Sequence, residues 1–415
     1  MINKKYAVVS SAYMSGNQCQ NKAGQYNEQG KYMKELELYL HIPFCERKCA
    51  YCDFLSAPAD PPVRISYIKK LQEEIAYYGA QYGEYQVSSI FFGGGTPTIL
   101  EGYQLAAILE TVKEHFNIAT DAEITVECNP GTLTAGKAEK LVQAGFNRLS
   151  MGLQSADDRE LQLLGRIHNF AQFLESYDLA RKAGFENINV DLMSALPGQT
   201  VKSWQNTLQK VTALRPEHIS AYSLIIEEGT PFYERFAEDE QIREEGGHPR
   251  LLPEEEVERQ MYELTEAFLH TKGYERYEIS NYAKQGYECR HNCGYWTRKD
   301  YLGLGLGASS FVEHQRFQNT SDLKEYLEQE YHHIHIETLD KKSEMEEYMF
   351  LGLRLMAGVS RQQFEKTFQV TLDSVYGEVL RKLKGEQLIE EVAGYVRLTE
   401  HGIDVSNYVL SEFLL

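Results

Sequence analysis

Two kinds of segment are missing from the 415-residue sequence: a long apolar run and a hydrophobic leader. No apolar stretch approaches the roughly 20 residues that a membrane-spanning helix needs. The N-terminus has none of the apolar core of a secretory signal. Cysteine is scarce as well, and we expect the seven cysteines to be thiols or metal ligands in a reducing compartment. These absences predict a cytoplasmic protein.

Positive charge is also in short supply. The chain has 42 Lys and Arg residues against 61 Asp and Glu residues, which gives a formal net charge of −19. A chain of this charge repels the phosphates of nucleic acids and the headgroups of anionic lipids, so we expect no nucleic-acid partner. The hydrophobic content of 42% is ample for a large core, and the length predicts two or three domains.

Three of the cysteines stand close together, at Cys45, Cys49 and Cys52, in a C-x3-C-x2-C stretch. They follow an apolar, strand-like run over residues 36–42 that Pro43 ends, so a loop should present them. Structural zinc sites normally use four protein ligands. Three thiolates suit a [4Fe–4S] cluster better, because one iron then stays open for a substrate or cofactor. A zinc knuckle, or three unrelated cysteines, is the alternative interpretation.

Strand-like and helix-like segments alternate from residue 36 to about residue 224. The predicted strands cover residues 36–42, 89–92, 123–127, 148–153, 187–192 and 218–224. Between them, apolar residues at steps of three and four predict helices over residues 65–82, 105–116, 134–144, 171–183 and 203–214. Such a run of βα units predicts an α/β fold with a parallel sheet.

Polar residues and glycines follow several of these strands. Because the carboxyl ends of parallel strands meet at one edge, residues there can share one site. Each of them alone is as readily a structural cap as a ligand, and a glycine run equally makes a tight turn. The candidates are Gly94, Gly95, Thr96, Glu127, Gln154, Arg166 and Asp191.

The cysteine spacing, with Tyr51 just before the last cysteine, resembles the radical S-adenosylmethionine (SAM) superfamily. The resemblance implies a partial (β/α)6 barrel with a [4Fe–4S] cluster on the three cysteines. In that superfamily SAM binds at the open iron, and one electron from the cluster cleaves it. The residues that the resemblance would assign to the cofactor site are Tyr39, Tyr51, Gly94, Gly95, Thr96, Glu127, Gln154, Arg166 and Asp191.

Within that superfamily the sequence resembles one group, which contains oxygen-independent coproporphyrinogen III oxidases and haem chaperones, and this resemblance extends over about residues 36–410. The oxidases carry a further cysteine two residues after the third ligand, where this chain has Phe54. The segment His291-Asn292-x-x-Tyr295-Trp296 matches a signature of the chaperones. Both features imply a protein that binds haem and hands it to respiratory haem proteins, with membrane contact only through those partners. The alternative is oxidative decarboxylation of coproporphyrinogen III. The sequence leaves open whether SAM cleavage serves catalysis or regulation.

Two segments after the barrel have two interpretations each. His291 is the candidate for contact with the haem iron or with the edge of the macrocycle, because imidazole is a common haem ligand. Equally, His291 and Asn292 can serve only to brace the loop after the barrel. The glycine-rich segment Gly303–Gly307 can let the backbone lie flat on a planar ligand, or it can reflect close packing.

Cys289 and Cys293 form a second C-x3-C, but the sequence offers no further ligand at metal spacing, so we expect no second metal site there.

Composition sets the remaining boundaries. Residues 1–32 are polar and aperiodic and predict a disordered extension before a barrel unit over residues 33–235. Residues 236–340 predict an acidic connector, with a mobile excursion over 237–259, a helix over 254–272 and a strand over 274–280. Residues 341–415 predict a winged-helix-like α+β domain, with helices over 345–356, 361–368 and 372–383 and a hairpin over 388–392 and 395–398.

Overall fold

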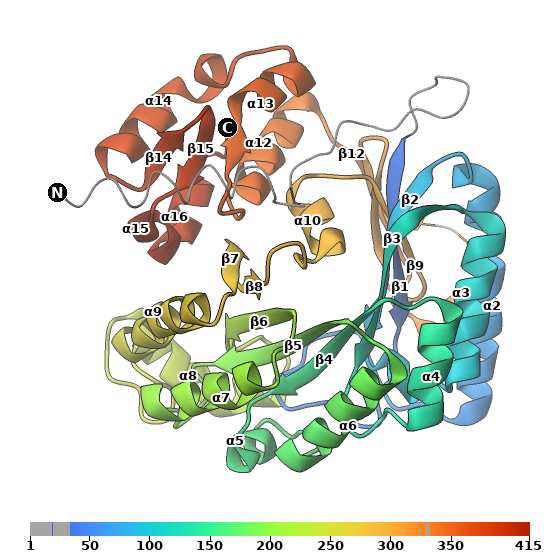
Figure 1. The fold of residues 1–415 in the computed structure, drawn as a ribbon. Coiled ribbons are helices and arrows are strands. Elements are labelled where there is room, and N and C mark those ends of the chain that lie inside the picture. The colour runs from blue at the N-terminus through green and yellow to red at the C-terminus, as the bar shows by residue number, and fades with distance from the viewer. Residues whose placement is uncertain (1–18, 20–33, 329–330, 332) are drawn as a thin grey trace.

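The computed structural model describes residues 19, 34–328, 331 and 333–415 (Figure 1). Its central feature is a set of parallel strands that alternate with helices, as the sequence predicted. The strands are β1 (Glu35–Ile42), β2 (Gln86–Gly94), β3 (Asn117–Cys128), β4 (Arg148–Gln154), β5 (Asn187–Ser194) and β6 (His218–Ser223). The segments between them are α2 (Pro61–Tyr82), η1 (Pro97–Ile99), α3 (Gly102–His115), α4 (Ala135–Ala144), α5 (Asp158–Leu163), α6 (Phe170–Ala183) and α7 (Val201–Ala213). Apart from Cys19, the predicted disordered extension over residues 1–32 lies outside the described residues.

These parallel strands belong to a larger mixed sheet with the order β12-β11-β10-β9-β1-β2-β3-β4-β5-β6-β8-β7. The added strands are β7 (Glu275–Glu278), β8 (Asn281–Ala283), β9 (Tyr301–Leu304), β10 (Ser309–Val312), β11 (Gln315–Asn319) and β12 (His333–Thr338). β9 pairs with β1 in parallel, and β8 pairs with β6 in antiparallel. In the described part of the chain the two end strands do not pair with each other, so the barrel is partial and open. The predicted α/β class is confirmed.

The predicted connector differs from the structure in two places. Strand β7 confirms the strand expected over residues 274–280 but is shorter, and strands β8 to β12 were not predicted. Strands this short carry too few residues to show a clear periodicity. Helix α9 (Glu255–Thr271) confirms the helix expected over residues 254–272. The stretch expected as a mobile excursion instead begins within a helix that was not predicted, α8 (Pro231–Glu244). The Thr230 side chain caps the start of α8 by accepting a hydrogen bond from the Tyr233 N–H, and Pro231 is the first residue of the helix.

The C-terminal residues form a separate helical unit with its own hydrophobic core. The predicted hairpin is confirmed as β14 (Ile389–Val392) and β15 (Tyr395–Leu398), and β13 (Val359–Ser360) adds a third strand beside β15. Its helices are α12 (Lys341–Gly352), α13 (Arg361–Phe368), α14 (Leu372–Gly385), α15 (Glu400–Asp404) and α16 (Ser406–Ser411). Within the residues that the structure describes, no helix combines the length and the apolarity that crossing a membrane requires.

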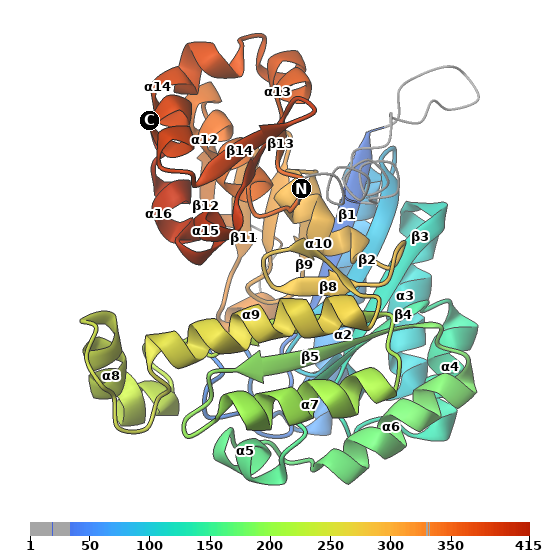
Figure 2. The same cartoon turned by 60° about the vertical axis from the view of Figure 1, so that its left-hand side comes forward.

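Side-chain alternation along β4 separates the core from the barrel interior. Leu149, Met151 and Leu153 are fully buried in the hydrophobic core between the sheet and the helices. Figure 2 shows two of those helices, α7 and α9, lying side by side against the outside of the sheet. Successive side chains of a strand point to opposite faces, so Arg148 and Ser150 point into the interior. The interior of the barrel is therefore polar where the core is apolar.

A short helix, α10 (Arg290–Trp296), covers the end of the barrel at which the strands begin, and it contacts both β2 and α12 (Figure 1). Glu123 on β3 accepts hydrogen bonds of 3.2 Å from the main-chain N–H groups of Arg290 and His291. These bonds satisfy the first donors of the helix. Gly294 permits the close approach to β1, because a Cβ atom there would overlap the Glu37 carboxylate. Helix α10 is therefore the floor of the barrel interior, opposite the loops that follow the strands.

Candidate functional site

The cysteines of the C-x3-C-x2-C stretch lie on the loop between β1 and α2. The Cys45 sulfur lies 3.5 Å from the hydroxyl oxygen of Thr96, and Arg166 Nη1 donates to the Cys49 sulfur at 3.6 Å. The cysteine loop is thereby tied to residues that follow β2 and β4. Burial raises the pKa of the Cys52 thiol to about 11. The free thiol is therefore protonated at neutral pH, and it would release its proton on binding iron.

Three thiols on one loop fit a cluster with an open iron. In residues 19, 34–328, 331 and 333–415, no group of three or more His, Cys, Asp or Glu side chains could hold a single metal ion. A cubane of four irons is bulkier than one ion, so its thiolates stand further apart than the ligands of a mononuclear site. The second cysteine pair has other partners. Cys293 forms a disulfide with Cys19, which was not predicted, and Cys289 donates to Glu123.

The glycines after β2 bring that turn against the cysteine loop. Gly94 has a φ of +110°, and a Cβ atom there would overlap the imidazole of His41. A Cβ atom on Gly95 would overlap the Phe44 backbone in the same way. Close packing thus accounts for both glycines, and their approach to a ligand stays a prediction.

Two partly buried carboxylates, Glu127 and Asp191, face the barrel interior from β3 and β5. Glu127 Oε2 accepts the Gly94 N–H at 3.1 Å. The Asp191 carboxylate accepts from Asn189 Nδ2 at 2.7 Å and from the Ser150 hydroxyl at 3.3 Å. Burial, and then the charge of Asp191, raises the pKa of Glu127 to about 8, and burial also raises the pKa of Asp191. Glu127 can therefore donate a hydrogen bond at neutral pH as well as accept one.

His291 lies on the floor, with both ring nitrogens engaged. Its Nδ1 atom lies 2.8 Å from the Ser89 hydroxyl oxygen, and its Nε2 atom lies 3.0 Å from the Tyr295 hydroxyl oxygen. The ring stacks on Phe91 with 5.1 Å between centroids. Burial lowers the pKa of His291 to about 3, so the imidazole is neutral. This geometry corresponds to the bracing interpretation of His291.

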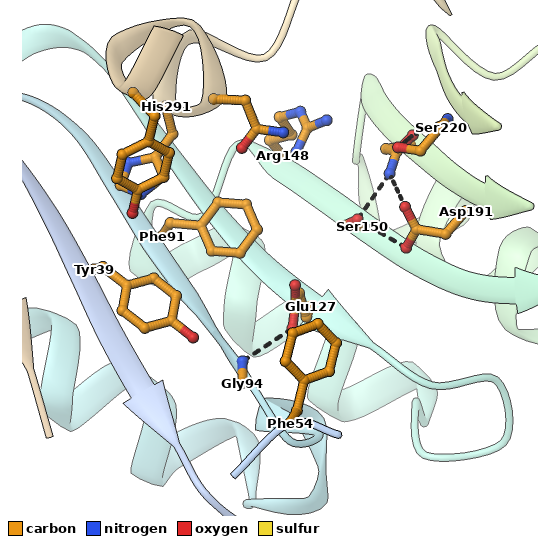
Figure 3. A pocket seen from close by; sticks show the side chains of 13 residues that line it. Tyr39, Phe54, Phe91, Gly94, Glu127, Arg148, Ser150, Asp191, Ser220 and His291 are labelled. Carbon is orange, nitrogen blue, oxygen red and sulfur yellow. Dashed lines mark hydrogen bonds between the residues drawn. The ribbon is translucent and has the colours of Figure 1, made fainter. Parts of the chain in front are cut away.

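One cavity of about 270 Å³ connects the carboxylates with the floor. Figure 3 shows Gly94 and Phe54 at one end, and His291 and Arg148 at the other. Phe54 is 63% exposed, so its end is the open one. The lining residues are Tyr39, Phe54, Phe91, Gly94, Glu127, Arg148, Ser150, Asn189, Asp191, Ser220, His291, Asn292 and Tyr295.

Several predicted site residues lie outside this cavity. Thr96 and Arg166 line a small separate hollow beside Cys49. Gln154 has a φ of +72° at the carboxyl end of β4, a conformation that is uncommon for a residue other than glycine, and it accepts from the Tyr222 hydroxyl at 3.0 Å. The ring of Tyr51 lies 6.4 Å from that of Phe232.

Of the segments after the barrel, some residues reach the cavity and others lie outside it. Tyr295 reaches the cavity, whereas Trp296 lies beneath the Arg354 guanidinium at 4.4 Å. Neighbouring atoms occupy the space beside the glycines of the segment Gly303–Gly307. A Cβ atom on Gly305, for example, would overlap the Tyr67 hydroxyl and the backbone of His41. Of the two interpretations of this segment, the structure supports close packing.

Sequence reasoning missed several polar residues of the site. Arg148, Ser150, Asn189 and Ser220 line the cavity, and Asn129 bridges Thr96 and Arg166 with hydrogen bonds of 2.7 Å. The available signal was the alternation of polar and apolar residues within predicted strands, as in Arg148-Leu149-Ser150-Met151. That pattern distinguishes a polar barrel interior from a strand buried on both faces.

Comparison with known proteins agrees with this architecture. The model described as "Radical SAM superfamily" matches residues 39–211, and the model described as "HemN C-terminal domain" matches residues 339–405. Coproporphyrinogen III oxidase (HemN) from Escherichia coli has a similar structure, with a TM-score of 0.78, 24% identity, and coverage of 92% of this chain and 90% of that one. At this identity the likeness shows the fold alone. These matches define the class, a radical SAM fold followed by a HemN-type C-terminal domain.

Full-length relatives narrow the class further. The chain is 38% identical to "Heme chaperone HemW" of Bacillus subtilis (strain 168) over 387 residues, which cover 91% of this chain and 98% of the relative. It is 34% identical to "Heme chaperone HemW" of Escherichia coli (strain K12), with the same coverage of 91% and 98%. The chain belongs to the HemW family of radical SAM proteins.

Proposed function

We propose that this protein is a haem chaperone, which binds haem and passes it to recipient haem proteins and which carries SAM and one [4Fe–4S] cluster. The observation that carries the proposal is 38% identity across 98% of the length of a relative named for that function. Phe54, in place of the fourth cysteine of the oxidases, supports the same conclusion. The proposal assigns the protein to the cytoplasm, with respiratory haem proteins as recipients and no nucleic acid as partner.

The cluster belongs to Cys45, Cys49 and Cys52 in this proposal, because the three thiols share one loop without a fourth cysteine. SAM belongs to the space between that loop and the carboxylates of Glu127 and Asp191. When both are bound, the cluster and SAM would supply one-electron chemistry there. Glu127 and Asp191 are suited to hydroxyl groups, since each can accept and, when protonated, donate. Tyr39, Tyr51, Gly94, Gly95, Thr96, Gln154 and Arg166 complete the proposed surroundings of the cofactor.

Haem is best accommodated at the mouth of the cavity. A volume of about 270 Å³ is slightly below the range of roughly 300–1,000 Å³ for pockets that enclose a drug-sized ligand. Haem is larger than such a ligand, so the haem ring would lie outside the cavity, in contact with the Phe54 side chain at its open end. We also propose the unit boundaries 33–235, 236–340 and 341–415, with the second unit contributing the floor helix.

The test is anaerobic reconstitution of the full chain, followed by parallel assays for haem binding and for coproporphyrinogen III decarboxylation. We expect a stoichiometric haem complex, transfer of haem to an acceptor apoprotein, and no decarboxylated product. Product formation without haem binding would replace the chaperone proposal with the oxidase alternative.

A further inference from the structure

Arg148 lines the cavity, and neither proposed cofactor explains its position there. It is the first residue of β4, so it lies near the floor and away from the cysteine loop. Its side chain is only 2% exposed, yet it lines the cavity, close to the His291 end (Figure 3). Throughout the described part of the chain, no hydrogen bond or ion pair to its guanidinium is found, and its Nε atom is buried without a partner.

The acidic neighbours of Arg148 are committed elsewhere. Glu123 and Asp191 are close enough to interact with it electrostatically. Glu123, however, accepts the N–H groups that start α10, and Asp191 accepts from Asn189 and Ser150. The donors of the guanidinium are thus left to whatever fills the cavity.

A buried guanidinium without an acceptor is costly, and the favoured acceptor is a carboxylate, which it can bind through two parallel N–H···O bonds. Asn292 also lines the cavity, and no hydrogen bond to its side-chain amide is found within the described residues. We propose that Arg148, with Asn292 beside it, forms a binding site for the carboxylate of a ligand that enters the cavity from the Phe54 end.

The methionyl carboxylate of SAM does not fit this site. In the proposed function that carboxylate belongs at the cluster, which is held by the loop after β1, whereas Arg148 lies where β4 begins. Repulsion of an entering carboxylate by Glu127 is weak, because burial raises the pKa of Glu127 to about 8 and keeps most of it neutral at pH 7, and burial also raises the pKa of Asp191.

Two sources can supply the carboxylate. One is a free short-chain acid, which fits a cavity of about 270 Å³ entirely. The other is a propionate arm of a tetrapyrrole whose ring stays at the mouth, and this second source alone depends on the proposed haem function. A free acid and a tetrapyrrole propionate would make the same contact with Arg148, so the test must use ligands that distinguish these two sources.

The experiment uses the reconstituted full chain without added SAM, because Glu127 and Asp191, which we assign to SAM, line the same cavity. Wild type, Arg148→Gln and Arg148→Lys are compared. Arg276→Gln is the matched control, since Arg276 is also a buried arginine but pairs with Glu266 and Glu400 outside the cavity. Sodium propionate is titrated by calorimetry. Haem and haem dimethyl ester, in which both propionates are masked, are titrated by Soret absorbance.

We expect propionate binding in wild type and in Arg276→Gln, at least tenfold weaker binding in Arg148→Gln, and partial retention in Arg148→Lys. A tetrapyrrole source predicts that esterification weakens haem binding at least tenfold in wild type and not in Arg148→Gln. A free-acid source predicts propionate binding with no effect of esterification.

The site is disproved if wild type binds no propionate and is indifferent to esterification, or if either effect persists in Arg148→Gln. The propionate titration and the esterification comparison on wild type alone can disprove the site, even if the Arg148→Gln variant does not fold. Failure of haem binding together with Arg148-dependent propionate binding would refute the proposed function and leave the carboxylate site standing.

Discussion

The Nδ1 atom of His291 lies 2.8 Å from the hydroxyl oxygen of Ser89, and this contact fastens the floor helix to the second strand of the barrel. With Nε2 bonded to Tyr295, the imidazole has no free nitrogen for haem iron in this arrangement. Ligation by His291 would require breaking one of these buried bonds. The structure therefore favours the bracing role that the sequence left open.

His291→Ala should lower the stability of the protein without changing the haem spectrum. The substitution leaves the Ser89 and Tyr295 hydroxyls without their partner, which typically costs about 1–3 kcal/mol for each buried group. We expect a lower melting temperature together with an unchanged Soret maximum. A displaced Soret band with an unchanged melting temperature would make His291 a haem ligand instead.

The same residue predicts a pH dependence. Burial lowers the pKa of His291 to about 3, whereas an unfolded histidine titrates near pH 6.5. The folded state thus binds fewer protons between these values, so the contribution of His291 to stability is full above about pH 6.5 and is lost as the pH falls towards 3. His291→Gln should flatten the decline of stability over this range, measured by urea unfolding at several pH values.

His248→Gln is the control for that measurement, because the His248 side chain is 86% exposed and its replacement should change the stability little. His168 is a buried histidine whose pKa is also lowered to about 3, so the decline should be reduced rather than abolished. Equal profiles for wild type and His291→Gln would show that His291 does not titrate as its burial implies.

The barrel was predictable from the sequence because its signals are local. Helices such as α4 and α6 have apolar residues at helical spacing, and each ends at a glycine, Gly145 or Gly184, with φ near +105°. The cysteine spacing and the resemblance that it carries occupy one continuous segment. None of these features depends on knowing what lies across the molecule.

The floor of the cavity could not be predicted in the same manner. Ser89 and His291 are 202 positions apart, and no periodicity connects them. Gly305 and Gly307 are likewise explained by neighbours distant in sequence, Tyr67 and Leu55. Arg148 could not be predicted as a site residue, because a charged residue at the start of an apolar strand typically marks a solvated strand end, and only the assembled partial barrel shows that it is buried.

Loss of either interior carboxylate should weaken SAM binding. Glu127→Ala and Asp191→Ala each remove a group that we assign to the cofactor. The loss of a hydrogen bond typically costs about 0.5–1.5 kcal/mol for a neutral group, such as protonated Glu127, and about 1.5–3 kcal/mol for a charged group. We expect calorimetric titration with SAM to show this loss in each variant.

Glu74→Gln is the matched control for the carboxylate variants. Glu74 is buried too, and burial raises its pKa to about 7, but its oxygens bond to Asn319 and Gly305 outside the cavity. SAM affinity should be unchanged there. Wild-type affinity in both Glu127→Ala and Asp191→Ala would refute the assignment of these residues.

The cluster should depend on each of the three loop cysteines. Cys45→Ala, Cys49→Ala or Cys52→Ala removes one thiolate, and two thiolates do not hold a [4Fe–4S] cluster with an open iron. We expect the iron content and the charge-transfer absorbance to fall to background while the far-UV circular dichroism is retained. Cys289→Ala is the control, because its buried thiol donates to Glu123 and should not contribute to iron binding. Half the iron missing from that control would reveal a second site.

Phe54 provides the test of where haem sits. Its ring is 63% exposed and lines the open end of the cavity, so it contributes little to the core. Phe54→Ala should therefore change the stability by no more than about 0.5 kcal/mol. If haem covers the ring, the variant loses that apolar contact, and we expect its haem affinity to fall by about 1–2 kcal/mol. Tyr103→Ala, which removes a 65% exposed ring from α3, should change neither quantity. Equal haem affinity in Phe54→Ala and wild type would move the haem site away from the mouth of the cavity.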